Sequence, residues 1–118
     1  RYPGKAVFID CWATWCAPCM KGIEAVEPMK ERMKGLDVVF VYLTNETSQM
    51  DAWSEQVIRI PGQHYRIKND IWNKIPGLGA IPQYYLYDRQ GKRVWETTGF
   101  GKETLKEIET EINRVLEQ

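Results

Sequence analysis

The sequence predicts a single domain of the α/β class, because strand-like and helix-like segments alternate along the chain. Residues 5–13 are a nearly continuous apolar run, as is typical of a strand buried on both faces of a parallel sheet, and residues 36–44 are interpreted as a second strand. Each strand is followed by a segment that we expect to be helical. A chain of 118 residues with 43% hydrophobic and 27% charged residues fits one such domain.

The first strand and the helix after it carry the features that bear on function. The apolar run of residues 5–13 is broken by a single acidic residue, Asp10. After it, residues 19–35 have apolar side chains at near-helical spacing, and Gly35 is placed to end that helix. We therefore expect a buried strand that leads into a helix of about four turns.

Four elements are expected in the middle of the chain. Residues 36–44 read as a second strand, and residues 48–57 as a polar, weakly amphipathic helix that Ser48 could cap. Residues 63–68 are expected to form a short extended segment. Residues 69–75 are expected to form a short helix, capped by one of its first two residues.

The C-terminal part of the chain is predicted to form a β-hairpin and a covering helix. Residues 83–98 contain two β-rich runs separated by the turn residues 88–91, which suits an antiparallel hairpin. Residues 102–118 place five apolar side chains on one helical face: Leu105, Ile108, Ile112, Val115 and Leu116. That face should pack on the sheet.

Charge and hydropathy disfavour two classes of partner. The chain has 16 basic and 16 acidic residues and no Lys/Arg cluster that would follow a phosphate backbone, so we expect no nucleic-acid partner. No apolar run approaches the ~20 residues that span a bilayer, and no segment resembles a signal peptide. Because the chain begins at Arg1 and enters an apolar run by Ala6, we expect residues 1–118 to be one domain excised from a longer protein.

The Cys-x-x-Cys pair formed by Cys16 and Cys19 is the main chemical signal. A zinc site needs about four ligands, and beyond this pair the chain offers only Cys11 and the single histidine, His64, so we expect no metal site. A structural disulfide of this spacing closes a very small loop and stabilises little, because loop-entropy stabilisation grows with loop length. Redox exchange is the interpretation that we favour.

The position of Cys16 favours that chemistry. Cys16 lies where the strand ends and the helix starts, so free helix N–H groups and the positive end of the helix dipole favour its thiolate. We interpret Cys16 as the nucleophile. Cys19, one turn into the helix, is expected to be less exposed and to resolve the mixed disulfide formed at Cys16.

Asp10 is a candidate acid or base. A carboxylate inside an apolar strand is costly to bury in its charged form, so its pKa should rise. The alternative is a structural aspartate whose hydrogen bonds are satisfied near the strand end. Cys11 alternates to the opposite face of the strand and is interpreted as a buried core thiol. His64 is expected at the surface or an edge and is given no role.

Two longer stretches carry a family resemblance. The stretch "VFIDCWATWCAPC" resembles the active-site strand of the thioredoxin superfamily, and "GAIPQYYLYDRQGKRV" resembles its proline loop and hairpin. The Trp-Ala-Thr-Trp-Cys string and the Asp-x-x-Gly-Lys turn are most similar to the TlpA/ResA-type thiol:disulfide oxidoreductases. The resemblance implies a thioredoxin fold, in which helices flank a central mixed β-sheet. The long segment between Thr44 and Pro82 implies a helical insertion before a cis-proline loop.

The resemblance also implies roles for individual residues. Asp10 takes the position of a buried carboxylate that relays a proton to or from the second cysteine. Pro82 takes the position of the cis-proline beside the dithiol, and the backbone of Ile81 would be offered to an extended substrate chain. Trp15 is expected at the edge of the site that meets the substrate. For Trp12, packing in the core and a role at the site are equally expected.

The activity implied by the resemblance is reduction of protein disulfides by dithiol exchange, with an electron-donor protein upstream. The Cys16–Cys19 disulfide would be the redox-active centre, with no other cofactor and no metal. An extracytoplasmic location is implied, either periplasmic or anchored to a membrane and facing outside. Membrane contact would come only through an anchor outside this chain, and we expect this fragment to be a monomer.

Other functions stay open on the sequence alone. An oxidase or isomerase could use the same dithiol, because neither Ala17 nor Pro18 fixes a reduction potential. A copper-handling or partner-docking domain is possible, since Cu(I) suits two thiolates, although related copper-delivery domains use wider cysteine spacing and a histidine. A peroxidase on this fold would need an upstream Pro and Thr loop that "CWATWC" lacks.

Overall fold

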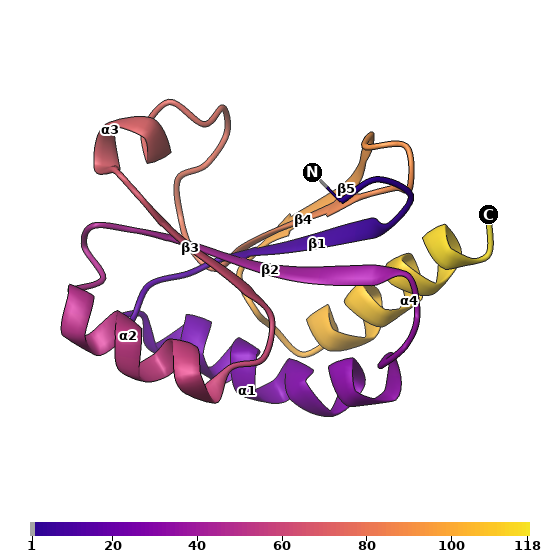
Figure 1. The fold of residues 1–118 in the computed structure, drawn as a ribbon, viewed down its shortest axis with the longest axis horizontal. Coiled ribbons are helices and arrows are strands. Elements are labelled where there is room, and N and C mark those ends of the chain that lie inside the picture. The colour runs from indigo at the N-terminus through magenta and orange to yellow at the C-terminus, as the bar shows by residue number, and fades with distance from the viewer. Residues whose placement is uncertain (1) are drawn as a thin grey trace.

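Residues 2–118, which the computed structural model describes, form one mixed β-sheet with helices on both of its faces (Figure 1). The strands are β1 (Ala6–Cys11), β2 (Val38–Asn45), β3 (Gln63–Ile67), β4 (Gln83–Tyr87) and β5 (Arg93–Thr98). The helices are α1 (Ala17–Arg32), α2 (Met50–Arg59), α3 (Asn69–Trp72) and α4 (Thr104–Leu116).

The strand order is β3-β2-β1-β4-β5, so β1 is the central strand. Strand β2 runs parallel to both β1 and β3, whereas β4 runs antiparallel to both β1 and β5. Helices α1, α2 and α4 lie on one face of the sheet and α3 lies on the other (Figure 1). The predicted α/β class, with a mixed sheet flanked by helices, is confirmed. No helix within residues 2–118 is long and apolar enough to span a bilayer.

The segment between β2 and β4 differs in one respect from the helical insertion that was expected. It holds the helices α2 and α3, but β3 lies between them and pairs with β2 at the edge of the sheet. The predicted extended segment at residues 63–68 is therefore a full member of the sheet. This short polar run becomes a strand because its backbone pairs with β2, a long-range contact that the local sequence does not reveal.

The predicted helix caps in this segment were wrong. Helix α2 begins at Met50, and its capping residue Gln49 makes no side-chain hydrogen bond. Ser48 is instead buried, where its hydroxyl pairs with the Thr44 hydroxyl at 2.7 Å. Helix α3 is capped by Lys68 rather than by either of its first two residues. In both places the cap lies one or two residues away from the position inferred from residue type.

The largest core cluster fills the space between the sheet and the two helices α1 and α4. Its buried members are Ala6, Phe8, Val26, Met29, Met33, Tyr84, Leu86, Ile108, Ile112 and Val115. A smaller cluster on the opposite face packs Cys11 and Tyr85 against Trp72 of α3. Cys11 is thus a free, fully buried thiol on the face away from α1, as the strand alternation predicted.

A glycine in the second turn of α1 permits close packing of the helix on the sheet. A Cβ atom at Gly22 would lie 2.6 Å from the Tyr84 hydroxyl oxygen and 3.1 Å from a ring carbon of Phe100. Contacts this short force neighbouring atoms to move. The small residue therefore sets how near α1 can approach strand β4.

The variant Gly22→Ala tests this contact. Alanine is the better helix former, but the added methyl group overlaps the Tyr84 hydroxyl, so we expect a loss of about 1–3 kcal/mol of unfolding free energy. Urea unfolding measures the loss, with Lys21→Ala at the exposed neighbouring position as the control. A gain of stability at position 22, as helix propensity alone would give, contradicts the packing.

Candidate active site

The two cysteines of the motif meet at the N-terminus of α1. Strand β1 ends at Cys11, a short loop follows, and Cys16 is the N-cap of α1 with extended backbone angles. Cys16 and Cys19 are joined by a disulfide with their Cα atoms 5.2 Å apart. The backbone N–H of Cys19 donates to the sulfur of Cys16 at 3.3 Å. The sulfur of Cys16 therefore takes the place of the side-chain oxygen that commonly caps a helix.

The two sulfurs have different surroundings. Cys16 borders a surface hollow that is lined by Trp15, Ala17, Pro18, Gly79, Ala80 and Ile81. Cys19 does not line this hollow and is fully buried. Cys16, which is 5% exposed, is thus the cysteine of the pair that borders the surface. Among residues 2–118, those that line the hollow carry no charge, and most of them are apolar, with the exposed ring of Trp15 as the largest side chain.

The loop before β4 forms the other wall of this hollow. The peptide bond between Ile81 and Pro82 is cis, and the carbonyl oxygen of Ile81 lies 4.0 Å from the sulfur of Cys16. Pro82 itself is buried. The structure thus brings Cys16 next to Ile81 and Pro82, although these residues are far apart in the sequence.

A turn after β2 holds the loop that carries the motif. The indole N–H of Trp15 donates to the Thr47 hydroxyl at 2.9 Å, and the backbone N–H of Thr14 donates to the Ser48 hydroxyl at 3.0 Å. Sequence reasoning missed this support, because Ser48 was interpreted as a helix cap. Trp15 remains 63% exposed despite its hydrogen bond, so its ring faces the surface beside Cys16.

An apolar cluster encloses the disulfide on the side of the sheet. Its buried members are Trp12, Ala13, Cys16, Cys19, Ile23, Tyr42 and Ile60. Trp12 is completely buried here, so it packs under the disulfide and does not shape the exposed surface. Trp53 of α2 packs against the cluster from its edge.

Asp10 is buried on the same face of β1 as Trp12. Its side chain is 2% exposed, and its Oδ1 atom has no hydrogen-bond partner within residues 2–118. Burial raises the pKa of Asp10 to about 8, and the positive charge of Lys30 opposes part of that rise. In this oxidised form neither cysteine sulfur carries a proton. A carboxyl group whose pKa is raised to this extent is able to exchange a proton near neutral pH.

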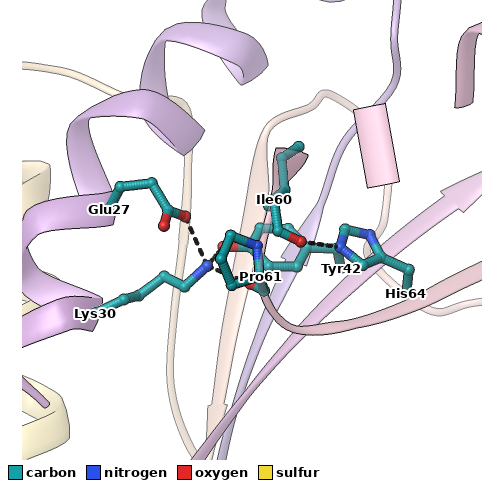
Figure 2. Close-up of polar contacts among 6 residues, drawn as sticks. All are labelled: Glu27, Lys30, Tyr42, Ile60, Pro61 and His64. Atoms are coloured by element: carbon teal, nitrogen blue, oxygen red, sulfur yellow. Dashed lines mark hydrogen bonds and ion pairs between the residues drawn. The ribbon is translucent and has the colours of Figure 1, made fainter. Parts of the chain in front are cut away.

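Lys30 is a buried cation that sequence reasoning missed (Figure 2). Its Nζ lies 2.6 Å from Glu27 Oε2 and donates to the Tyr42 hydroxyl at 2.7 Å. The Pro61 carbonyl oxygen accepts a third hydrogen bond. Burial lowers the pKa of Lys30, whereas the hydrogen bond and the charge of Glu27 raise it. The sequence does hold a signal for this burial, because Lys30 comes four residues after Val26 and therefore lies on the apolar face of α1.

The contacts of Lys30 tie α1 to β2 and to the connection that enters β3. His64 completes this corner, because its Nε2–H donates to the Ile60 carbonyl at 2.7 Å and its ring stacks on Tyr42 at 4.9 Å (Figure 2). Burial lowers the pKa of His64. His64 thus lies on an edge strand, as expected, but its ring is packed and hydrogen-bonded.

Comparison with known proteins identifies relatives over nearly the whole chain. The family model described as Redoxin matches residues 1–112. The thiol-disulfide oxidoreductase ResA of Bacillus thuringiensis (strain Al Hakam) is 26% identical over 117 residues, which cover 95% of this chain and 64% of ResA. The thioredoxin-like protein YneN of Bacillus subtilis (strain 168) is 31% identical over 117 residues, covering 93% of this chain and 65% of YneN. The chain thus spans just under two thirds of these relatives.

Solved structures share the fold. A thiol:disulfide interchange protein of the thioredoxin family from Chlorobium tepidum TLS has a TM-score of 0.81 at 17% identity, covering 98% of this chain and 82% of that chain. The thioredoxin domain of a thiol-disulfide oxidoreductase from Bacteroides vulgatus has a TM-score of 0.77 at 17% identity, covering 95% and 82%. At these identities the likeness shows the thioredoxin fold alone.

The variant Asp10→Asn tests the buried carboxyl group through the pH dependence of stability. The folded protein holds this proton up to about pH 8, whereas the unfolded chain releases it near 3.8. The stabilising contribution is complete below 3.8 and is lost as the pH rises to about 8. Wild type should therefore lose up to about 1.4 kcal/mol per pH unit in this window relative to Asp10→Asn.

Urea unfolding of the oxidised proteins across this pH window measures the difference. Asp70→Asn, which changes an exposed aspartate, is the control and should keep the wild-type slope. Equal slopes in wild type and Asp10→Asn would contradict a carboxyl group that stays protonated in the fold.

The variant Lys30→Met tests the charge that faces Asp10. Methionine fills similar space without the ammonium group, so the pKa of Asp10 should rise beyond about 8 when the opposing charge is removed. A carbon-13 NMR titration of the Asp10 carboxyl group measures it. Lys34→Met, which removes an exposed cation one turn later, should leave the titration unchanged. An Asp10 pKa that falls or stays the same in Lys30→Met contradicts the coupling.

Proposed function

We propose that this chain, which belongs to the Redoxin family, is a thiol:disulfide oxidoreductase that exchanges electrons through Cys16 and Cys19. The observation that carries the proposal is the sulfur of Cys16 at the N-cap of α1, where it accepts the Cys19 N–H and borders an open hollow. The names of the relatives, thiol-disulfide oxidoreductase and thioredoxin-like protein, support the same activity.

In the proposed reaction the thiolate of Cys16 attacks one sulfur of a substrate disulfide. A mixed disulfide forms, the substrate disulfide breaks, and the other substrate sulfur leaves as a thiolate. Cys19 gives its proton to Asp10 and attacks the sulfur of Cys16, which releases the second substrate thiolate. The substrate gains two electrons, and the protein ends with the Cys16–Cys19 disulfide.

The structure supports separate roles for the two cysteines. A negative charge on Cys16 is favoured by the Cys19 N–H and by the positive end of α1. Cys19 is enclosed, so it meets only a sulfur already bound to Cys16. Ile81 lines the hollow beside Cys16, which suits contact between its backbone and an extended chain. Trp15 would form the outer edge of that contact.

The direction and setting of the reaction rest on the resemblance to TlpA/ResA-type proteins. We propose reduction of protein disulfides as the favoured direction, with an electron-donor protein that returns the Cys16–Cys19 disulfide to the dithiol. An extracytoplasmic location follows from the same resemblance. No cofactor beyond this disulfide enters the proposed reaction. Oxidation or isomerisation of disulfides would use the same two cysteines with a different reduction potential.

Single cysteine variants test the assignment of roles. Cys19→Ser keeps the nucleophile but cannot resolve the intermediate, so it should accumulate mixed disulfides through Cys16. Cys16→Ser should accumulate few, because Cys19 is buried. Incubation with a disulfide-bonded protein substrate, followed by non-reducing electrophoresis and mass spectrometry, measures the adducts.

Turnover of wild type in a disulfide-reduction assay tests the activity itself. We expect catalytic reduction of an unfolded disulfide-bonded protein with an external dithiol as electron source. Absence of turnover would contradict the proposed function. In the trapping experiment, equal amounts of mixed disulfide in Cys19→Ser and Cys16→Ser would contradict the roles assigned to the two cysteines.

A further inference from the structure

Two buried oxygens on neighbouring strands have no hydrogen-bond partner within the described chain. One is Oδ1 of Asp10 and the other is the hydroxyl oxygen of Tyr84. Both side chains are almost completely shielded, with exposures of 2% for Asp10 and 0% for Tyr84. Buried polar groups without a partner are uncommon, because leaving such a group unsatisfied is unfavourable. The pair therefore calls for a physical explanation.

The strand register places these two side chains side by side. Asp10 of β1 is directly opposite Tyr84 of β4 in the antiparallel ladder. Directly opposite residues share a face of the sheet, with their Cβ atoms about 4.5–5.5 Å apart. The ring of Tyr84 is fixed by stacking on Phe8 at 5.7 Å and by an edge contact with Phe100 at 6.4 Å. Its hydroxyl group therefore has one defined position.

That position lies against the turn of α1 that follows Cys19. Gly22 comes three residues after Cys19, and only its missing Cβ leaves room for the Tyr84 hydroxyl group. A glycine inside a helix is less favourable than alanine, and a phenylalanine at position 84 would remove the closest contact. The fold thus accommodates a polar hydroxyl group at a site where a plain aromatic ring would pack with less constraint.

We propose that Tyr84 is a positioning residue for Asp10, whose carboxylate accepts a hydrogen bond from the Tyr84 hydroxyl group through one bridging water molecule. The inference rests on the proposed function, in which Asp10 takes the proton of Cys19. A water molecule in this position would satisfy both unpartnered oxygens. The hydrogen bond would be strongest when Asp10 is ionised and able to accept that proton.

The cation and the second tyrosine near Asp10 already have hydrogen-bond partners, whereas the buried indole N–H of Trp12 on the same face has none among the described residues. Lys30 of α1 is bound to Glu27 and donates to the Tyr42 hydroxyl group, so each of these groups has at least one partner. Tyr84 is the facing tyrosine whose hydroxyl group is uncommitted. Burial and the charge of Asp10 raise the pKa of Tyr84, so its phenol stays neutral and remains a donor throughout the working pH range.

The variant Tyr84→Phe tests this role. A donor that favours the ionised carboxylate is lost, so the pKa of Asp10 should rise by roughly one unit. At neutral pH that shift leaves about tenfold less ionised Asp10, and resolution by Cys19 should slow to a similar extent. Tyr85→Phe is the matched control, because the neighbouring tyrosine packs with Cys11 on the opposite face.

Carbon-13 NMR titration of Asp10 in the oxidised proteins gives the direct readout. A raised pKa in Tyr84→Phe with a wild-type pKa in Tyr85→Phe supports the inference. An unchanged or lowered pKa in Tyr84→Phe overturns it, since a tyrosine that only packs would not alter the titration. This measurement needs no turnover, so it decides the role of Tyr84 even if wild type proves inactive and the proposed function fails.

A second measurement covers the case in which Tyr84→Phe does not fold. In wild type with carbon-13 at the tyrosine Cζ position, the resonance of Tyr84 should shift as Asp10 titrates near pH 8. A Tyr84 resonance that ignores this titration overturns the inference.

Discussion

The junction between β1 and α1 is the constraint on which the site depends. The central strand β1 leads to the N-terminus of α1. Cys16 is the N-cap residue there, so its side chain lies beside the free N–H groups of the first helical turn. The same turn brings Cys19 within disulfide distance and buries it completely, so Cys16 borders the surface hollow and Cys19 does not. The different chemistry of the two sulfurs thus follows from their order along one helix.

The surroundings of Asp10 favour the uncharged form of its side chain, whereas those of Cys16 favour a negative charge. The strand that carries Asp10 is central and covered by α1, so the carboxyl group has little water, and its pKa rises to about 8. The surrounding fold limits this effect with one cation: Lys30 lies on the buried face of α1 and bonds to Tyr42, the residue that pairs with Asp10 on β2. Because Lys30 also binds the Pro61 carbonyl group, the segment before β3 is attached to the surroundings of Asp10.

Much of this arrangement could be predicted from the sequence, because its signals are local. The apolar run of β1, the Cys-x-x-Cys spacing and the turn at residues 88–91 each depend on neighbouring residues alone. The missed features depend on contacts between distant segments. Ser48 looks like a helix cap in the sequence, but in the structure its hydroxyl group binds the backbone of Thr14. Lys30 looks like a surface lysine in the sequence, but in the structure it donates to Tyr42 and Pro61. The edge strand β3 likewise exists because β2 lies beside it.

Titration of the reduced protein tests the central claim most directly. The ultraviolet absorbance of the thiolate, followed with pH in wild type and in Cys19→Ser, reports when the sulfur of Cys16 ionises. The helix N-terminus and the Cys19 backbone N–H, which is kept in the serine variant, predict ionisation at a lower pH than for a cysteine in an unstructured peptide. Ionisation at the same pH as the peptide, or higher, would contradict the account.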